Sequence, residues 1–336
     1  MEVLVTGGLG YIGSHTCVAL AQAGITPVIV DNLSNASSNV LKQLTSITGQ
    51  QFDFYQGDVG NTNLMSQIFA EHNIDAVFHF AALKAVGEST EFPIRYYQNN
   101  VAKTLTLLET MSSADVTKMI FSSSATVYGE PQYLPIDEDH PISATNPYGW
   151  SKVMVEQALK DLCLSNEKWL ALPLRYFNPV GAHESGLIGE SPKGVPNNLM
   201  PFIAQTAVGK RAHVQVFGDD YETPDGTGVR DYIHIKDLAK GHVDSYLAHQ
   251  HDTGFKPYNL GTGHGYSVLE MINAFSLASN VAIPYEKAPR RAGDIACNYA
   301  DASLAEKKLG WKAQLGLKAM TEDTWRWQTQ YPDGLE

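Results

Sequence analysis

The sequence has 336 residues, of which 43% are hydrophobic and 18% are charged, a composition typical of ordered globular proteins. The net charge of -12 argues against binding to nucleic acid, which needs a basic face, but a pocket lined by arginines can still bind a small anion. No apolar run approaches the roughly 18 residues of a membrane span and no leader pattern precedes the first strand, so we expect a soluble, cytoplasmic protein without a membrane or nucleic-acid partner.

Short β-branched segments alternate with longer amphipathic stretches along the first half of the chain. The expected strands cover residues 3–7, 27–31, 53–58, 76–81, 119–124 and 170–177. Between them apolar residues recur at helical spacing, for example Val155, Ala158, Leu159 and Leu162. Strands that are apolar on both faces and alternate with helices predict an α/β fold with a doubly wound parallel sheet, which binds ligands at the carboxyl ends of its strands.

The segment GGLGYIG follows the first expected strand and opens the first expected helix. At this place Gly7 allows a tight turn, Gly10 lets a pyrophosphate approach the backbone, and Gly13 lets the helix pack closely on the sheet. Asp31 ends the second strand, where a carboxylate suits the two hydroxyls of an adenosine ribose and repels a 2′-phosphate. The pattern predicts a Rossmann-type domain that binds NAD rather than NADP, with the phosphates at the helix N-terminus.

Two further strand ends carry candidate cofactor contacts. Asp58 ends the third strand, where its carboxylate can accept a hydrogen bond from the adenine amino group. The segment FAALKAV ends the fourth strand and is expected to run beside the cofactor. Within it we interpret Lys84 as a phosphate or ribose ligand; a solvated lysine is the alternative.

A tyrosine and a lysine lie four residues apart in NPYGWSK, at the expected start of a helix. Residues at this spacing share one helix face about 5–6 Å apart, so Lys152 can lie beneath Tyr148. The same spacing in YIHIK separates Tyr232 from Lys236, but the alternating pattern there predicts a strand, on which four residues span about 13 Å. Tyr148 and Lys152 are therefore the candidate acid–base pair, and an ordinary packing tyrosine is the alternative.

The proposed chemistry requires the pKa of Tyr148 to fall by about three units, which is about 4 kcal/mol. A lysine ammonium about 4 Å away supplies roughly this energy at an effective dielectric constant near 20, and an oxidised nicotinamide adds a second positive charge. The segment SSSATVYG ends the fifth strand, so that Ser124 is expected to hold the substrate hydroxyl. Tyr148, Lys152 and Ser124 are thus the expected catalytic residues.

Taken together, these motifs resemble the extended short-chain dehydrogenase/reductase family, and in particular its UDP-glucose 4-epimerases. The resemblance covers essentially the whole chain and rests on VTGGLGYIGSHT, HFAALKAVGES, FSSSATVYG, NPYGWSK, RYFNPVGAH, NNLMP, GTGVRDYIH, YNLGTG and RRAGD. It implies a base at Tyr148, a partner at Lys152 and a 4-keto sugar intermediate, with NAD retained through the cycle. It also implies a homodimer formed through helices at residues 96–111 and 149–163, although those apolar faces can equally be buried within one chain.

The resemblance assigns the remaining contacts and the domains. The implied cofactor contacts are Gly7, Gly10, Tyr11, Ile12, Gly13, Asp31, Asn32, Asn35, Asp58, Val59, Phe80, Ala81, Lys84, Asn99, Ser122, Tyr148, Lys152, Tyr176 and Phe177. The implied UDP-sugar contacts are Lys84, Ser124, Tyr148, Asn178, Asn198, Leu199, Phe217, Arg230, Arg291, Asp294 and Asn298. We expect residues 1–177 to form the NAD-binding domain and residues 178–336 to form mainly a smaller, α/β domain for the UDP-sugar.

Related activities are discriminated by single positions. Sugar-nucleotide 4,6-dehydratases carry an acidic pair just after the serine position, where this chain has Ala125 and Thr126, so elimination of water is not expected. Another epimerase or decarboxylase of the extended family stays open as an alternative. A non-catalytic NAD-sensing module is a further alternative, which the intact Ser124, Tyr148 and Lys152 disfavour.

Asn298 marks a departure from the family pattern. In the family a bulky tyrosine just before the aromatic residue of YADAS restricts the room around the sugar, whereas this chain reads ACNYADAS. The hypothesis is that the pocket also admits UDP-GlcNAc and UDP-GalNAc; the alternative is that neighbouring side chains refill the space.

The cysteines and histidines form no metal-binding pattern. Cys17, Cys163 and Cys297 are too scattered for a disulfide framework, and His234 and His242 lack a partner at metal-ligand spacing. We therefore expect no metal site, and packing roles for Cys17 and Cys163.

Overall fold

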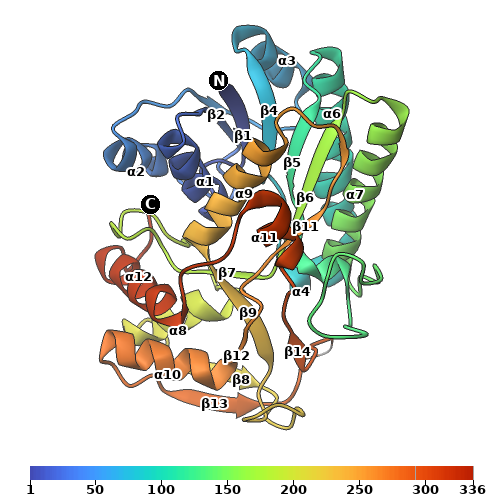
Figure 1. Ribbon diagram of the computed structural model, residues 1–336. Helices are drawn as coiled ribbons and strands as arrows, with labels where there is room; N and C mark the ends of the chain where they lie inside the picture. Colours follow the sequence, from blue (N-terminus) through green and yellow to red (C-terminus); the bar gives the residue numbers. More distant parts are fainter. Residues whose placement is uncertain (292, 336) are drawn as a thin grey trace.

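A parallel sheet forms the larger layer of the molecule, in the upper part of Figure 1. The computed structural model describes residues 1–291 and 293–335. In this described chain the sheet has the strand order β10-β6-β5-β4-β1-β2-β3. Strand β11 also pairs directly with β6, nearer the C-terminal end of β6 than β10 does. Its strands are β1 (Glu2–Thr6), β2 (Thr26–Asp31), β3 (Phe54–Gln56), β4 (Ile74–His79), β5 (Lys118–Ser122), β6 (Leu170–Tyr176), β10 (Gly254–Phe255) and β11 (Tyr258–Leu260). The expected doubly wound sheet is confirmed, and each expected strand lies at its place, with ends that differ by at most two residues from the prediction.

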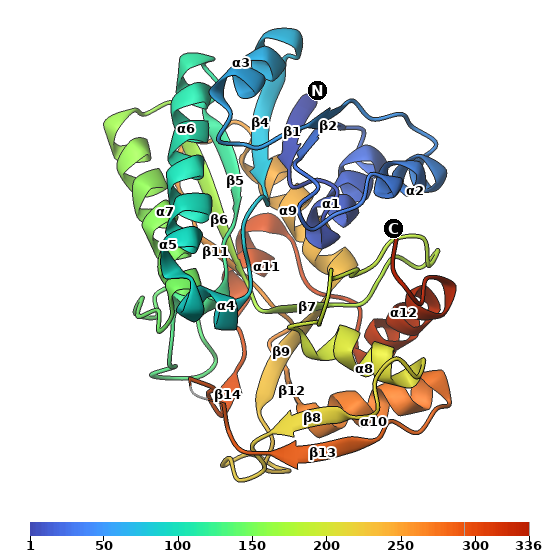
Figure 2. The ribbon, with the colours of Figure 1, turned by 180° about the vertical axis from the view of Figure 1, so that it is seen from behind.

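Helices cover both faces of this sheet (Figures 1 and 2). One face carries α1 (Tyr11–Gln22), α2 (Asn39–Thr48), α9 (Ile235–His249) and α11 (Ser303–Leu309). The other carries α3 (Thr62–Glu71), α6 (Lys103–Ser113) and α7 (Pro147–Ser165). On β1, Val3 and Val5 face the first core and Leu4 faces the second, because successive side chains of a strand point to opposite faces. Both faces are buried, which is why the strands are apolar throughout.

Short helices connect β4 to α6 along the edge of the larger layer. They are α4 (Val86–Glu91), α5 (Pro93–Tyr96) and a π-helical segment, Tyr97–Ala102, that runs directly into α6. The expected helix over residues 96–111 is therefore present, but it contains a π-helical turn at its start. Such turns are frequent at functional sites.

A smaller layer lies below the carboxyl ends of the parallel strands (Figure 1). Its strands are β7 (Asn178–Val180), β8 (Val214–Phe217), β9 (Val229–His234), β12 (Gly265–Ser267), β13 (Tyr285–Ala288) and β14 (Cys297–Asn298). Its helices are α8 (Leu199–Ala207), α10 (Val268–Ser279) and α12 (Leu317–Gln330). Residues of these helices and strands share one core, in which Met200, Val216, Phe275 and Met320 are almost fully buried.

The chain returns to the larger layer after β9. Helix α9 packs against α1, and strands β10 and β11 extend the parallel sheet beside β6. The division at residue 177 thus describes where the chain first leaves the sheet, whereas later residues complete both layers. The assignment of the two halves to NAD and UDP-sugar stays a prediction about function.

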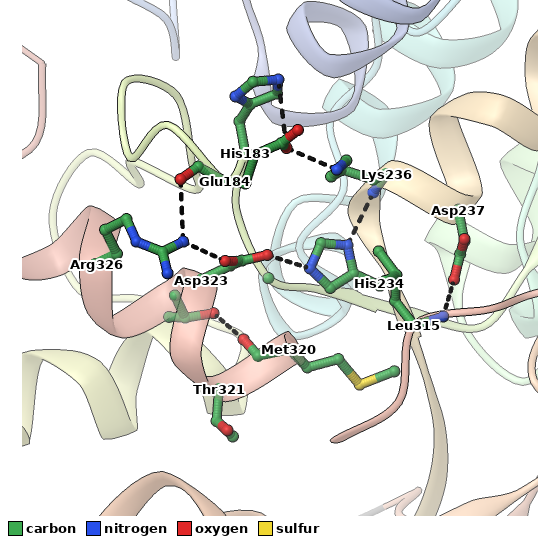
Figure 3. A network of polar contacts seen from close by, with 12 residues as sticks. His183, Glu184, His234, Lys236, Asp237, Leu315, Met320, Thr321, Asp323 and Arg326 are labelled. Atoms are coloured by element: carbon green, nitrogen blue, oxygen red, sulfur yellow. Dashed lines mark hydrogen bonds and ion pairs between the residues drawn. The ribbon is translucent and has the colours of Figure 1, made fainter. Parts of the chain in front are cut away.

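Helix α12 is fastened to the junction of β9 and α9 by a polar network (Figure 3). The Asp323 carboxylate lies 3.3 Å from Nε2 of the buried His234 and also pairs with Arg326. Nδ1 of His234 accepts a hydrogen bond from the backbone N–H of Lys236, whose ammonium lies 2.7 Å from Glu184. His234 therefore caps α9 and holds it to α12.

The segment YIHIK differs from its prediction. Its first residues lie in β9, but the strand ends at His234 and Ile235 already opens α9. A strand-to-helix junction lies between Tyr232 and Lys236, so the two side chains are not neighbours on one helix face. None of the described helices is long and apolar enough to cross a membrane.

Candidate active site

A cleft of about 960 Å³ separates the two layers and is lined by residues of both. The cofactor wall consists of residues 7, 9–14, 30–32, 34–37, 57–59 and 80–87, which lie at or after the ends of β1, β2, β3 and β4. The sugar wall consists of Asn178, Asn198, Arg230, Arg291, Asp294 and Asn298. Ligands of open parallel sheets bind at this place, beyond the carboxyl ends of the strands.

The glycine turn on the cofactor wall fits a dinucleotide phosphate. Gly7 has a φ of 66°, a left-handed conformation that favours glycine. A Cβ on Gly13 would collide with the carbonyl oxygen of Gly7, so the first turn of α1 lies against the turn that precedes it. No side chain caps the N-terminus of α1. Its backbone N–H groups consequently face the cleft without a side-chain acceptor, as an anion requires.

Asp31 stands at the end of β2 and lines the cleft. Its carboxylate accepts hydrogen bonds from the backbone N–H groups of Leu9 (3.2 Å) and Leu33 (2.8 Å). Burial raises the pKa of this carboxyl group, and the two hydrogen bonds oppose that rise. The residue therefore ties the glycine turn to the next strand end and keeps a carboxylate where an adenosine ribose is expected.

Asp58 is also on the cofactor wall, but it has partners that the sequence did not indicate. Its carboxylate lies 2.6 Å from the Lys103 ammonium and accepts a hydrogen bond from Asn32 at 3.1 Å. Lys103 stands at the start of α6 and lines the cleft. It adds a positive charge beside the cofactor wall that no motif marks.

Helix α7 brings the expected catalytic residues together. Asn146 caps the helix by accepting from Gly149 N–H, and Pro147 occupies its first turn. One turn apart, Tyr148 and Lys152 are both buried on the cleft side. The Lys152 ammonium donates to the carbonyl oxygen of Ser122 at 2.7 Å and lies 5.7 Å from the centre of the Tyr148 ring.

Ser124 lies close enough to Tyr148 to lower the pKa of the tyrosine, so the three expected catalytic side chains converge on one part of the cleft. A second hydroxyl pair lies directly beside them, because Ser122 is hydrogen-bonded to Tyr176. The arrangement places a proton acceptor, a cation and a hydroxyl donor around one position, as general base catalysis on an alcohol needs.

The expected pKa shift of Tyr148 is wrong for the protein by itself. Burial raises the pKa of Tyr148 to about 12, against a lowering by the hydrogen bond with Ser124. Burial lowers the pKa of Lys152 to about 7, against a raising by Glu156. The desolvation of the two buried groups thus outweighs the attraction between them, which the sequence argument left out.

Glu190 is a residue of the cleft that the sequence did not mark. Its carboxylate, with a side chain only 10% exposed, lies 2.9 Å from the Lys84 ammonium and accepts from Asn198 at 2.8 Å. Lys84 comes from the cofactor wall and Asn198 from the sugar wall. Glu190 therefore connects the two walls through Lys84 and Asn198, which are both expected to bind ligand. No local sequence pattern indicates Glu190.

On the sugar wall the charged residues differ in their partners. Arg291 pairs with Asp294 at 2.8 Å and stacks over the Phe217 ring at 4.8 Å. Arg230 donates to its neighbouring carbonyl oxygen, and no carboxylate of the described chain pairs with it. Asn298 lies beside Arg230 in the register of β14 and β9, and its buried Oδ1 has no hydrogen-bond partner among the described residues.

The cleft contains almost all of the expected positions. Leu199, the first residue of α8, and Phe217, the last of β8, do not line it, although Phe217 contacts Arg291 there. The remaining expected residues on its surface are Gly10, Tyr11, Ile12, Asn32, Asn35, Val59, Phe80, Ala81, Asn99, Tyr176 and Phe177. Among the described residues no group of three or more His, Cys, Asp or Glu is arranged to hold a metal ion.

Comparison with known proteins identifies first the class. A family model described as GDP-mannose 4,6 dehydratase matches residues 4–324. The fold and site are thus those of a nucleotide-sugar-modifying enzyme with a dinucleotide-binding sheet.

More similar relatives narrow the family. A UDP-glucose 4-epimerase of Dictyostelium discoideum is 56% identical over 334 residues, 99% of this chain and 97% of the relative. The structure of a UDP-glucose 4-epimerase from Bifidobacterium longum in complex with NAD+ and UDP superposes with a TM-score of 0.97 at 55% identity, covering 100% of both chains. A UDP-Glc/GlcNAc 4-epimerase from Campylobacter jejuni gives a TM-score of 0.85 at 36% identity, covering 98% of this chain and 99% of that one. The chain belongs to the UDP-glucose 4-epimerase family.

Proposed function

We propose that the chain interconverts UDP-galactose and UDP-glucose through a 4-keto sugar, with a bound NAD. The observation that carries this proposal is the convergence of Ser124, Tyr148 and Lys152 on a cleft whose opposite part holds the glycine turn and Asp31. NAD, when bound, takes up the hydrogen of C4 with its electron pair and returns it. The 54–56% identity to UDP-glucose 4-epimerases over nearly the whole chain supports the same activity.

The residues of α7 handle the proton. Tyr148 removes the proton of the 4-hydroxyl group, while Ser124, which lies beside Tyr148 in the cleft, orients that hydroxyl. Lys152 is held against the carbonyl oxygen of Ser122 and provides a positive charge close to the tyrosine ring. Burial keeps the pKa of Tyr148 high in the protein alone, and an oxidised nicotinamide, when bound, would supply an additional positive charge that lowers it.

The sugar wall holds the nucleotide diphosphate. Arg230 and Arg291 offer guanidinium groups to phosphate oxygens, with which they form strong charge-assisted hydrogen bonds. Asn178 and Asn198 add amide donors on the same wall. Fixing the sugar through its diphosphate leaves the hexose ring free to present either face, which an epimerase requires.

Asn298 supports a second substrate pair, UDP-GlcNAc and UDP-GalNAc. Its side chain is smaller than the tyrosine of the family pattern and its buried Oδ1 is unpartnered among the described residues, so that it can accept from an amide N–H. The structural relative from Campylobacter jejuni is named for both Glc and GlcNAc substrates.

The expected homodimer and cytoplasmic location belong to the same proposal. Leu105 on α6 and Trp150 and Met154 on α7 are each more than 40% exposed, and they support a dimer contact on this side of the sheet. Sedimentation of the intact protein at micromolar concentration tests the dimer, and a monomer there would remove this part of the proposal. The cytoplasmic location stays a prediction.

The test of the main proposal uses the purified protein, incubated with UDP-galactose alone and followed by proton NMR. The formation of UDP-glucose without added cofactor shows a resident NAD that regenerates itself. Tyr148→Phe should lower kcat about 1,000-fold, within the range of general acid–base catalysis. The control is Tyr232→Phe, the other tyrosine that has a lysine four residues later, which should keep its activity. Full activity of Tyr148→Phe would refute the role of the tyrosine, and NAD binding without turnover would indicate a sensor.

A further inference from the structure

A buried ion pair lies one turn beyond Lys152 on the catalytic helix. Arg175 of β6 donates to both carboxylate oxygens of Glu156, with Nη2 2.6 Å from Oε2 and Nε 3.1 Å from Oε1. The side chain of Arg175 is 6% exposed and that of Glu156 is 7% exposed. The desolvation of two charges is costly, and such a pair adds little stability compared with apolar residues of similar size. The burial of the Glu156–Arg175 pair therefore indicates a role other than stability.

The second contact of Glu156 leads to the catalytic serine segment. The hydroxyl group of the fully buried Ser123 donates to Glu156 Oε1 at 2.5 Å. Its two neighbours in the chain belong to the site, since the Ser122 carbonyl oxygen accepts from Lys152 and the Ser124 side chain lines the cleft beside Tyr148. The carboxylate therefore holds the middle residue of the segment that positions the base and its partner.

The far side of the pair continues toward the sugar wall. Arg175 Nη1 lies 3.1 Å from the hydroxyl of Tyr128, which donates to Oδ1 of Asn259 at 2.6 Å. Nδ2 of Asn259 donates to the Ile136 carbonyl oxygen at 2.9 Å, and the backbone N–H of Ile136 donates to Tyr299. Tyr299 directly follows Asn298. An unbroken set of hydrogen bonds thus connects the serine segment with the end of β14 at the sugar wall.

The charges around Lys152 show what Glu156 contributes. Burial lowers the pKa of Lys152, and the negative charge of Glu156 raises it. His79 on β4 also lies near Lys152, but burial lowers its own pKa to about 3, so it stays neutral at neutral pH. Tyr148 is the other titratable group in contact with the ammonium. Glu156 is thus the source of negative charge that favours a protonated Lys152.

The opposite side of Glu156 is lined by groups of other elements. Arg175 on β6 is the cation that it pairs with, and Tyr128, whose pKa burial raises, lies against Arg175. Arg175 also donates to the backbone carbonyl oxygen of Glu138, in the loop before α7, and its positive charge opposes the rise that burial causes in the pKa of the Glu138 carboxyl group. Arg175 therefore balances the negative charge of Glu156 in its buried position.

We propose that Glu156 is a positioning residue of the epimerase site: through Ser123 it fixes the serine segment, and through its charge it keeps Lys152 protonated. This inference rests on the proposed roles of Tyr148 and Lys152. It predicts two separable effects, because the hydrogen bond to Ser123 acts on geometry and the carboxylate charge acts on proton affinity.

The electrostatic effect is tested with Glu156→Gln in the NAD-containing enzyme, by measuring kcat for UDP-galactose as a function of pH. Without the negative charge of Glu156, Lys152 loses its proton at a lower pH, so the alkaline limb of the kcat profile should move to lower pH. Beside a less charged lysine, Tyr148 keeps its proton up to a higher pH, so the acid limb of the kcat profile should move to higher pH. Each limb should shift by about one pH unit, as is typical for a lost neighbouring charge. Asp161→Asn, an exposed carboxylate on the same helix, should leave both limbs in place.

The positional effect is tested with Ser123→Ala, which removes the hydroxyl and keeps every charge. This variant should lower kcat about tenfold at all pH values, with both limbs unmoved and KM little changed, the cost of a slightly displaced catalytic group. Glu156→Asp keeps the carboxylate and should restore the wild-type limbs, with a reduced rate. If Glu156→Gln is too unstable to assay, Glu156→Gln/Arg175→Gln removes the unpaired cation as well and carries the same pH test.

The outcomes separate this inference from the proposed function. A uniform loss of rate in Glu156→Gln with unmoved limbs would overturn the electrostatic role, and wild-type kcat in Ser123→Ala would overturn the positional one. If instead Tyr148→Phe keeps its activity, the proposed function itself fails. An inactive Tyr148→Phe together with a narrowed profile in Glu156→Gln supports both.

Discussion

The cofactor wall takes its groups from short contiguous segments at the ends of β1 to β4. The sugar wall consists of single residues from β7, β9, β14, the N-cap of α8 and the loop before β14. On the cofactor wall the backbone is the main binding surface, and buried parallel strands hold it in place. On the sugar wall long side chains reach into the cleft from half-exposed positions, as Arg291 does with a side chain that is 56% exposed.

This difference has a consequence for ligand binding. A turn made of backbone is rigid and tolerates no added side chain, so a change there removes the whole binding site. A wall made of separate side chains loses one contact at a time. We therefore expect all-or-none effects on the cofactor wall and graded effects on the sugar wall.

The largest effect is expected for Gly13→Ala. The new Cβ would collide with the carbonyl oxygen of Gly7, so the turn or the start of α1 must move. We expect NAD to be lost on purification, activity to disappear, and the free energy of unfolding to fall by about 1–3 kcal/mol. Absorbance of the released cofactor and thermal unfolding measure this. Gly316→Ala, where a Cβ meets nothing within 4 Å, is the control and should retain NAD. Retention of NAD by Gly13→Ala would show that the backbone turn is adaptable.

A graded effect is expected for Arg230→Ala on the sugar wall. Losing a charge-assisted hydrogen bond to a phosphate costs about 2 kcal/mol, which corresponds to a roughly 30-fold increase in KM for UDP-galactose. The value of kcat should change much less, because the contact is the same in the ground state and the transition state. Initial rates over a range of substrate concentrations give both constants.

Arg211→Ala is the matched control for this change. Arg211 stacks on Phe202 outside the cleft and should keep the wild-type KM. A fall in kcat without a change in KM for Arg230→Ala would instead place the guanidinium at the reacting atoms.

A smaller effect, on selectivity alone, is expected for Asn298→Tyr. The larger side chain fills the space beside Arg230, so turnover of UDP-GalNAc should fall about tenfold relative to UDP-galactose. Competition between the two substrates in one reaction measures the ratio. Cys297→Ala is the control, since the preceding residue of β14 does not line the cleft. Negligible turnover of UDP-GalNAc by the unchanged enzyme would show that neighbouring side chains already fill the pocket.

The smallest effect at neutral pH concerns stability, because only an acidic pH should destabilise the cofactor region. Burial lowers the pKa of His15 on α1 and His79 on β4 to about 3, and that of His242 on α9 to about 4. An unfolded histidine takes up its proton near pH 6.5, so these residues cost stability progressively as the pH falls from about 6.5 toward 4, and cost none above it. We expect NAD to be released as the pH falls through this window.

His242→Leu isolates one of these contributions. The residue lies between the rings of Phe80 and Tyr176, where an apolar side chain fits. At pH 5 the variant should be more stable than the unchanged protein by about 2 kcal/mol, relative to their difference at pH 8. Thermal unfolding at the two pH values measures this, with the exposed His251→Gln as control. Equal pH dependence in variant and parent would contradict the argument.

The residues that the sequence assigns to cofactor binding line the cleft, and the sequence could indicate them because their signals are local. A glycine turn, a strand-ending carboxylate and an N-terminal cap followed by Tyr148 and Lys152 each lie within a few residues. Local segments carry their own conformational preferences, so the residue types alone indicate the turn, the strand end and the helix start.

The sugar wall was predicted in a different way. Its residues follow from resemblance to a family, since two arginines far apart in a chain carry no signal by themselves. Leu199 and Phe217 were expected at the cleft but do not line it. Asn198, the neighbour of Leu199, does line it, because a shift of one residue in a strand or helix turns a side chain to another face.

By itself the sequence determined the alternation of strands and helices, the glycine turn and the helix that carries Tyr148 and Lys152. Only the tertiary structure decided which distant charges meet: Lys103 with Asp58, Glu190 with Lys84, and Arg175 with Glu156. It also decided the pKa of Tyr148 and Lys152, which burial moves in the opposite direction to their mutual attraction. The physical reason is the same for both. Pairing and desolvation depend on the whole surroundings of a group, and these surroundings come from segments that the sequence keeps far apart.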